Sequence, residues 1–208
     1  MMDAANGQEK AVFDKRVLRL IDIFGSICLL ILASPLFIII PFLIRIDSPG
    51  NVFFIQERLG LDGEPFKLIK FRTMFINKSR GIWTVKNDPR ITRVGKLLRP
   101  FHLDELPQLI NVLRGDLSMV GPRPYTKEVH DLMCRENPDF ALRLHFQPGL
   151  TGWAQLSGRN GDNTLKDHLV LLKYDMIYFS SPITIIHYKN IIAKTIRYVC
   201  SNSVHKTF

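Results

Sequence analysis

An uncharged run from Ile23 to Ile44 constrains this chain more than any other feature of its sequence. As a straight helix, its roughly 22 residues would reach about 33 Å, enough to cross a hydrocarbon core of about 30 Å. Ser34-Pro35 interrupts the run near its middle, and Pro41 follows. An interior proline removes a backbone hydrogen bond and kinks a helix, and a neighbouring serine can satisfy a carbonyl left free. The run therefore predicts either a kinked spanning helix or a segment that turns back at Ser34 and Pro35.

Basic residues flank this run on both sides. They are Lys10, Lys15, Arg16 and Arg19 before it and Arg45, Arg58, Lys67, Lys70 and Arg72 after it. Because basic residues favour the cytoplasmic side of a membrane, this distribution favours a re-entrant helix-break-helix over residues 15–48 that enters and leaves by one face. A single spanning anchor is the alternative, and hydropathy alone favours it.

The remainder of the chain has the size of one compact domain. We assign residues 1–14 to a flexible N-terminus, 49–200 to the main folded domain and 201–208 to a C-terminal tail. The formal net charge of +9 predicts an anionic partner, which could be a nucleic acid, an acidic lipid or a phosphorylated substrate. Three widely spaced cysteines form no metal or disulfide pattern, so we expect reduced thiols in a chain that faces the cytoplasm.

Two short strands and five helices can be placed by their patterns. Val52–Arg58 and Phe66–Thr73 predict a hairpin, because glycine, aspartate and proline lie in the turn between them. The helices are expected at Ile91–Arg99, His102–Leu113, Thr126–Glu136, Thr164–Phe179 and Pro182–Cys200. The last helix has an apolar face made of Ile185, Tyr188, Ile192, Ile196 and Val199. That face suits a helix packed on the core or an amphipathic helix in the headgroup layer.

Asp104 and Glu105 lie where the second of these helices should begin. Free N–H groups and the positive end of the dipole at a helix N-terminus favour phosphate and keep carboxylates ionised. Carboxylates can also form acyl phosphates and bind Mg²⁺. Acidic residues in a first turn are, however, ordinary helix stabilisers, so this pair alone does not establish a site.

Several basic side chains strengthen the case for a phosphate site. Lys70 and Arg72 alternate with Phe71 and should share one face of a strand. Arg99 precedes Asp104 by five residues, and Arg123 is held between two prolines. Each could be a solvated charge, but together they supply what a diphosphate needs. The six histidines are scattered, and no dinucleotide or P-loop motif is present.

A second candidate ligand segment is the loop-rich stretch 147–160, which ends in Gly158-Arg159-Asn160.

Several ordered motifs now match a known family. Besides Ser34-Pro35 they are Lys70-Phe71-Arg72-Thr73-Met74, Asp88-Pro89-Arg90-Ile91-Thr92-Arg93-Val94-Gly95, Leu103-Asp104-Glu105-Leu106-Pro107-Gln108-Leu109, Asn111-Val112-Leu113, Gly115-Asp116-Leu117-Ser118-Met119-Val120-Gly121-Pro122-Arg123-Pro124 and Pro148-Gly149-Leu150-Thr151-Gly152-Trp153-Ala154-Gln155. From about Lys15 to Arg197 the chain resembles the bacterial sugar transferases, also called monotopic phosphoglycosyl transferases.

The resemblance implies a helix-rich α+β fold with a re-entrant membrane helix-break-helix, interfacial amphipathic helices and a small β-hairpin. It implies transfer of a sugar-1-phosphate from a UDP-sugar to polyprenyl phosphate, on the cytoplasmic face of the bacterial inner membrane. Asp104 would be the nucleophile and Glu105 the ligand of Mg²⁺, while Lys70, Arg99 and Arg123 would serve the phosphates and the nucleotide. The short length resembles the minimal form of the family.

Two features depart from the family pattern. His102 stands where a serine is common, and residues 180–186 lack the usual Trp-Ser and Asp-Leu-Lys pattern. A membrane-anchored nucleic-acid-binding protein and a catalytically inactive scaffold of a glycan assembly complex are the alternatives. No nucleic-acid-binding motif is evident, and the intact Asp104-Glu105 pair argues against the scaffold. The choice of sugar, the pathway and assembly into a homo-oligomer stay open.

Overall fold

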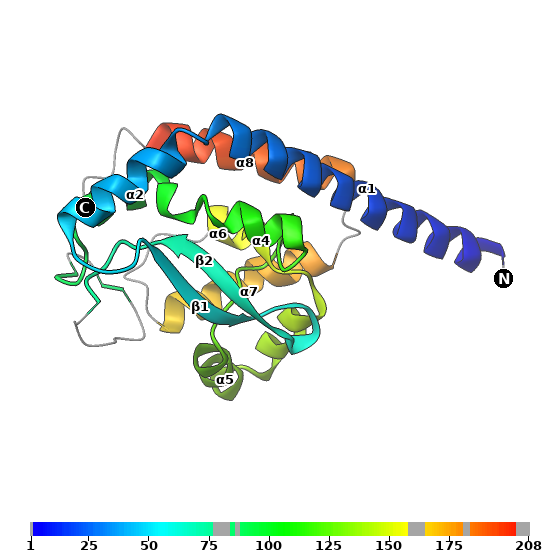
Figure 1. Cartoon of the computed structure of the whole chain (residues 1–208). Helices are drawn as coiled ribbons and strands as arrows, with labels where there is room; N and C mark the ends of the chain where they lie inside the picture. Colours follow the sequence, from blue (N-terminus) through cyan, green and yellow to red (C-terminus); the bar gives the residue numbers. More distant parts are fainter. Residues whose placement is uncertain (1, 77–83, 86–87, 158–164, 181–183, 203–208) are drawn as a thin grey trace.

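The computed structural model describes residues 2–76, 84–85, 88–157, 165–180 and 184–202, with side chains described from residue 15 to 199 within these ranges. The helices are α1 (Met2–Leu32), α2 (Leu36–Asp47), α3 (Arg93–Leu98), α4 (Gln108–Arg114), α5 (Lys127–Glu136), α6 (Trp153–Ser157), α7 (Leu165–Phe179) and α8 (Ile185–Asn202). The strands are β1 (Phe53–Leu59), β2 (Pro65–Phe71), β3 (Ser118–Val120) and β4 (Gly149–Thr151). This confirms a helix-rich α+β fold with a small hairpin (Figure 1).

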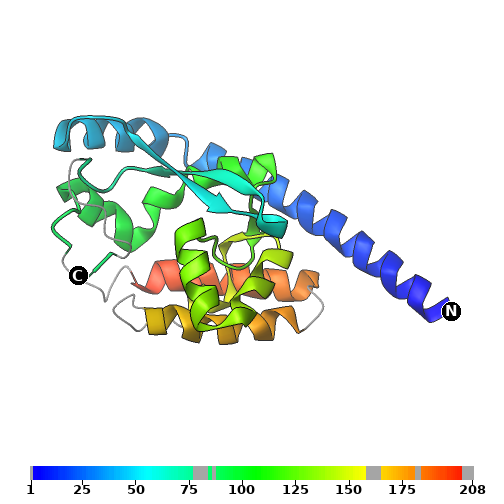
Figure 2. The same cartoon turned by 90° about the horizontal axis from the view of Figure 1, so that it is seen from below.

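The hairpin is antiparallel, with Phe53 opposite Phe71 and Leu59 opposite Pro65. A second sheet, in which β3 and β4 pair in parallel, was not predicted. Strands of three residues are too short to show alternation, so their pairing comes from the packing of distant segments. Seen from below, the hairpin lies on one side of the body and α7 with α8 on the other (Figure 2).

The predicted break in the apolar run is present at residues 33–35, which form a turn between α1 and α2. Within the described residues, no helix taken singly meets the length and apolarity that a membrane span requires. Lys15–Leu32 and Leu36–Asp47 meet these criteria only as a pair, and the pair is bent by 62°. The missing N–H of Pro35 gives a local reason for the bend. α1 itself begins at Met2, well before Lys15.

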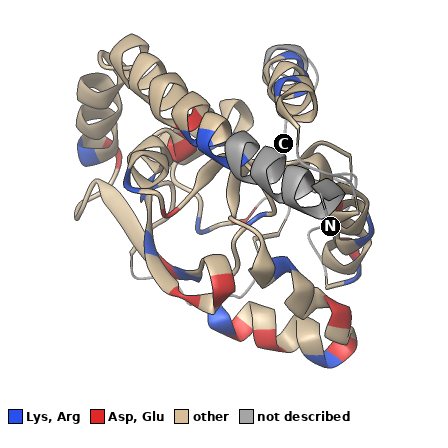
Figure 3. Ribbon diagram, turned by 90° about the vertical axis from the view of Figure 1, so that its right-hand side faces the viewer, with Lys and Arg blue, Asp and Glu red and all other residues tan. Residues whose placement is uncertain are grey.

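α1 and α2 expose many large apolar side chains. The most exposed are Leu20, Phe24, Ile31, Leu32, Ile38, Phe42 and Ile46, each more than half exposed. Charged residues are sparse over α2 and the neighbouring part of α1, whereas they gather over the hairpin and α5 (Figure 3). An apolar surface of this extent, rimmed by polar residues, is typical of a membrane or protein contact.

A buried polar cluster joins α1 to the body of the protein. Asp22 on α1 accepts hydrogen bonds from the Tyr188 hydroxyl on α8 and, at 2.9 Å, from the backbone N–H of Met119 on β3. The Tyr188 hydroxyl also contacts Ser118 Oγ at 2.9 Å. Because a buried carboxylate without such partners would be costly, these bonds fix α1 relative to both α8 and β3.

The predicted apolar face of the last helix is confirmed in part, since Ile192 packs against the core. Tyr188 and Ile191 are buried in the core, whereas Ile196, which the pattern placed on the apolar face, is 59% exposed. In the sequence, the predicted face follows steps of three or four residues from Ile185. In the structure, α1 and β3 contact the side of α8 that carries Tyr188 and Ile191. α8 therefore packs on the core along one side and leaves Ile186 and Ile196 exposed on another.

Candidate active site

Asp104 and Glu105 lie in a short 3-10 turn, Leu103–Glu105, and not in the first turn of an α-helix. The prediction of one helix over His102–Leu113 is therefore wrong. His102 has left-handed backbone geometry (φ 55°), and α4 begins only at Gln108, after Pro107. Pro107 has no N–H to continue the preceding turn. The two carboxylates consequently do not lie at a helix N-terminus, and the dipole argument does not apply to them.

Glu105 forms ion pairs with basic side chains at the centre of the site. Lys70 Nζ lies 2.7 Å from Glu105 Oε1, and Arg123 Nη2 lies 3.6 Å from the same oxygen. Lys70 comes from β2, Glu105 from the 3-10 turn and Arg123 from the loop after β3. The structure thus brings together three of the predicted site residues from segments that are far apart in the sequence.

Asp104 is more deeply buried than its neighbour, with 9% of its surface exposed. Burial raises the pKa of Asp104 above its ordinary value, and the adjacent Glu105 raises it further, while Lys70 and Arg99 act in the opposite direction. This is the reverse of the ionisation that a helix N-terminus would favour. A carboxylate whose charge is poorly solvated is a stronger base and a better nucleophile than one in water.

Asn111 on α4 holds the hairpin against the site. Its side chain accepts a hydrogen bond from Ile69 N at 3.1 Å and donates one to Lys67 O at 2.8 Å. Both partners belong to β2, the strand that carries Lys70. A fully buried amide that satisfies a strand edge in this way sets the position of Lys70 relative to the turn that follows α3. Burial lowers the pKa of Lys70, and Glu105 partly offsets this.

The loop that carries Arg123 is fixed by its backbone. A Cβ atom on Gly121 would overlap the carbonyl oxygen of Gln147, so the close approach of β3 to the segment before β4 requires glycine. Arg143 Nη2 donates to the carbonyl oxygen of Arg123 at 3.0 Å, and Arg58 Nη1 donates to that of Pro124 at 3.3 Å. These contacts fix the backbone on either side of Arg123, and its guanidinium in turn lies 3.6 Å from Glu105.

Arg99 lies beside the same turn. Its Nε donates to Thr73 Oγ1 at 2.9 Å. Burial lowers the pKa of Arg99, and the charge of Asp104 is the largest effect that raises it. Arg99 is therefore oriented by the segment after β2 and lies within the electrostatic reach of Asp104.

Arg58 joins the site although the sequence analysis assigned it no role there. Burial and the nearby Arg123 lower its pKa to about 10, and Glu105 acts in the opposite direction. Its position could have been inferred from the hairpin register. Phe54 is opposite Lys70 and Arg58 is opposite Phe66, so Arg58 and Lys70 share one face of the sheet.

Arg72 does not belong to the group around Glu105. Its guanidinium donates to the carbonyl oxygens of Pro49 at 2.5 Å and Ser48 at 2.7 Å, in the segment that follows α2. β2 ends at Phe71, so the strand alternation that paired Arg72 with Lys70 no longer holds at this position. Ser34 and Pro35 form the bend between α1 and α2, and Gly158-Arg159-Asn160 lies outside the described residues.

The described part of the chain contains no cluster of three or more His, Cys, Asp or Glu side chains that could hold a metal ion. Asp104 and Glu105 are adjacent carboxylates, however, and Mg²⁺ is commonly held by one or two carboxylates together with substrate phosphates and water. The donor set therefore fits Mg²⁺ bound jointly with a phosphorylated substrate.

The site combines two adjacent carboxylates with four basic side chains. These come from the hairpin, the 3-10 turns after α3 and the loop after β3. Such a site is suited to a phosphorylated substrate. The family model for bacterial sugar transferases matches residues 13–202, so the chain belongs to the bacterial sugar transferase family.

Curated relatives agree with this assignment. The chain is 41% identical to UDP-glucose:undecaprenyl-phosphate glucose-1-phosphate transferase of Escherichia coli (strain K12), over 76% of this chain and 34% of that protein. It is 42% identical to the protein of the same name from Caulobacter vibrioides, over 71% and 57%. It is 37% identical to UDP-N-acetylgalactosamine-undecaprenyl-phosphate N-acetylgalactosaminephosphotransferase of Aeromonas hydrophila, over 77% and 38%. The chain thus spans about a third to a little over half of the length of these relatives.

Proposed function

We propose that this protein transfers a sugar-1-phosphate from a UDP-sugar to polyprenyl phosphate, the first membrane step in the synthesis of a glycoconjugate or exopolysaccharide. The observation that carries the proposal is the convergence of Lys70, Arg99 and Arg123 on the Asp104-Glu105 pair. A diphosphate needs several cationic donors, and the chemistry needs a carboxylate of raised basicity beside them. The names of the relatives support the same reaction.

In the mechanism that we propose, a carboxylate oxygen of Asp104 attacks the β-phosphorus of the UDP-sugar. The bond from that phosphorus to the bridging oxygen breaks, UMP leaves, and the sugar-phosphate is held on Asp104 as an acyl phosphate. A phosphate oxygen of the polyprenyl phosphate then attacks the same phosphorus. The acyl phosphate bond breaks, the Asp104 carboxylate is regenerated, and the product is a polyprenyl diphosphate-sugar.

The basic side chains would act mainly by electrostatic stabilisation. Arg123 and Arg99 can each present a planar pair of donors to phosphate oxygens, and Lys70 adds a compact ammonium. Glu105 orients Lys70 and Arg123 through its ion pairs. Mg²⁺, which Glu105 would hold, would supply further neutralisation of the diphosphate.

The assay that tests the proposal measures UMP release with a panel of UDP-sugars, with and without polyprenyl phosphate. We expect one UDP-sugar to give sustained UMP release together with a lipid-linked sugar diphosphate, and excess EDTA to abolish both products. If UMP fails to form with every UDP-sugar, or if turnover continues in full with excess EDTA, the reaction or the role of Mg²⁺, respectively, is wrong.

We also propose that α1 and α2 form a re-entrant membrane segment, with the catalytic domain on the cytoplasmic face. Its support is the 62° bend of an apolar helix pair that has basic residues on both sides. We expect topology reporters fused to either terminus to indicate the cytoplasm. Pro35→Ala, which restores a helical N–H, should move a fraction of the N-terminal reporter to the periplasm. A periplasmic N-terminus in the unaltered protein would establish a spanning anchor instead.

A further inference from the structure

The first half of β1 is apolar and exposed on both of its faces. Phe53, Phe54 and Ile55 follow one another along the strand, and 43%, 47% and 58% of their surfaces are exposed. A strand that covers a core alternates between buried apolar and exposed polar residues. β1 does not do so at this end: Phe53 stacks on Phe71, but the described chain leaves about half of the Phe54 and Ile55 surfaces uncovered.

Phe54 lies next to the proposed site. It is opposite Lys70 in the hairpin register, so the two side chains project from the same face of the sheet as directly paired neighbours. Such pairs have Cβ atoms about 4.5–5.5 Å apart. Lys70 Nζ in turn lies 2.7 Å from Glu105. A half-exposed aromatic ring thus borders the cations that would hold a phosphate.

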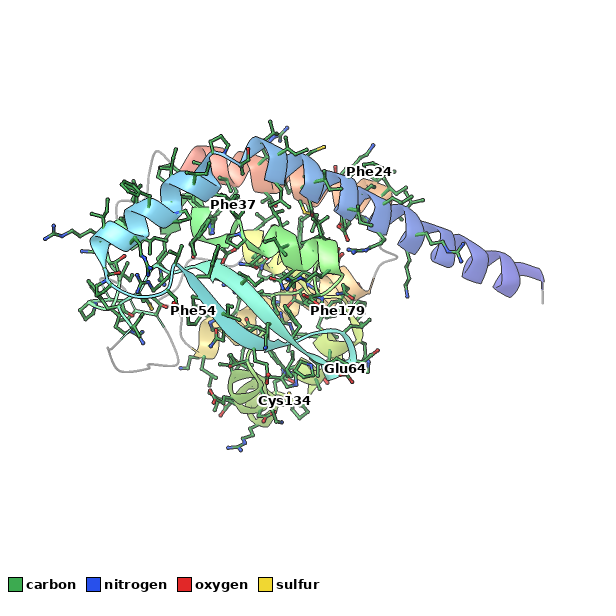
Figure 4. The ribbon with its side chains drawn as sticks, in the orientation of Figure 1. Phe24, Phe37, Phe54, Glu64, Cys134 and Phe179 are labelled. Atoms are coloured by element: carbon green, nitrogen blue, oxygen red, sulfur yellow. The ribbon has the colours of Figure 1, made fainter. Side chains whose placement is uncertain are left out.

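Aromatic contacts connect this end of the hairpin to the apolar helix pair. The ring of Phe53 stacks on that of Phe71, with centroids 5.5 Å apart and an interplanar angle of 19°. Phe71 also contacts Phe37 of α2, with centroids 5.3 Å apart. Phe37 and Phe54 accordingly lie toward the same end of the molecule (Figure 4). These contacts lie on the face of the hairpin opposite to Phe54, and they hold the end of β1 that carries Phe54 against α2.

We propose that Phe54 binds the isoprenoid chain of the polyprenyl phosphate, close to its phosphate, and so aligns this lipid for the second half of the reaction. The inference rests on the proposed function. A lipid whose phosphate reaches Lys70 must lead its apolar chain from the cationic cluster back to the membrane. Phe54 lies at the end of the hairpin that the contacts among Phe53, Phe71 and Phe37 hold against α2, so its half-exposed ring lies between Lys70 and the apolar helix pair. Stacking of a sugar ring on Phe54 is the competing occupant, and the test separates the two.

The test compares Phe54→Ser with Ile55→Ser, a matched change on the next residue, whose side chain projects from the opposite face of β1. We expect Phe54→Ser to raise KM for polyprenyl phosphate about tenfold, because the apolar contact of the ring with the isoprenoid chain would be lost. KM for the UDP-sugar and lipid-independent UMP release should stay within about twofold of the original. Ile55→Ser should leave all three quantities unchanged.

Chain length gives a second measurement. The original protein should prefer long polyprenyl phosphates to short ones, and Phe54→Ser should reduce this preference, while Phe54→Leu should restore most of it. An unchanged KM for the lipid, or an increase in KM for the UDP-sugar instead, would overturn the inference. Equal loss of binding to vesicles without polyprenyl phosphate would also overturn it, since Phe54 would then contact bulk lipid. If the original protein transfers nothing to polyprenyl phosphate, the proposed function fails instead.

Discussion

Asp104→Asn is expected to reduce turnover at least a thousandfold, because a neutral amide is a poor nucleophile toward phosphorus. The variant should also fail to form the adduct that the original protein forms with UDP-sugar alone. That adduct is a sugar-phosphate on the peptide that contains Asp104, and intact-protein and peptide mass spectrometry would detect it. Asp62→Asn is the matched control, because Asp62 lies on the hairpin turn with its side chain 69% exposed.

The alternative mechanism is direct attack by the lipid phosphate, with Asp104 acting only as a second ligand of the metal. It predicts that UMP release strictly requires polyprenyl phosphate, whereas the covalent route allows a burst without lipid and gives ping-pong kinetics. Near-normal turnover of Asp104→Asn, or a burst that depends on lipid, would exclude the covalent route. Either result would leave membership of the family intact.

The raised pKa of Asp104 means that ionisation of this side chain lowers the stability of the folded protein. Because burial raises the pKa in the folded state, the unfolded chain releases the proton first as pH increases, and ionisation of Asp104 therefore destabilises the fold at neutral pH. Asp104→Asn should consequently raise Tm at pH 7. The difference should shrink as pH falls below the ordinary pKa of an aspartate, where both states are protonated. The burst rate should fall as pH decreases through the raised pKa.

Asp175→Ala is expected to destabilise the protein by about 3–5 kcal/mol, because it leaves Arg143 as an unpaired buried charge. Arg143 Nε lies 2.7 Å from Asp175 Oδ2, and both side chains are at most 6% exposed. Burial raises the pKa of Asp175 even though Arg143 opposes this effect. Desolvation therefore dominates this ion pair, so replacing both partners by apolar residues should cost less than removing one.

Equilibrium unfolding in urea measures these differences. Asp131→Ala is the control: it removes an exposed i,i+4 pair with Lys127, and it should change stability by less than about 1 kcal/mol. Arg143 also donates to the backbone of Arg123, so Asp175→Ala should lower kcat/KM at temperatures where the protein is still folded. A loss of stability similar to that of Asp131→Ala would show that the buried pair contributes little.

Local patterns in the sequence were sufficient for several features. The bend at Ser34 and Pro35 follows from a proline that lacks an N–H inside an apolar run. The hairpin follows from turn residues between two apolar segments, and its observed strands lie within two residues of the predicted ones. The family assignment follows from ordered motifs, which also identified Asp104 and Glu105 as the carboxylates of the site.

Other features depend on contacts between segments that are distant in the sequence. Lys70 and Glu105 are 35 positions apart and meet where Asn111 of α4 bonds to the backbone of β2. Strand alternation assigned Arg72 to the site and gave no reason to include Arg58. In the structure, β2 ends at Phe71 and Arg72 lies outside the site, whereas the hairpin register places Arg58 on the same face as Lys70. The buried side of α8 was likewise set by its neighbours, since helical periodicity cannot show which of two adjacent apolar faces will be covered.

The ionisation of Asp104 shows most clearly which properties depend on local sequence and which depend on tertiary packing. From the sequence alone, a carboxylate at an expected helix start should have been kept ionised by the helix dipole. In the folded protein the helix begins later, and burial together with Glu105 raises the pKa instead. The sequence specifies that residue 104 is an aspartate and which residues precede and follow it. The loss of solvent around the carboxylate is a property of the whole packed structure, and only the tertiary fold decides it.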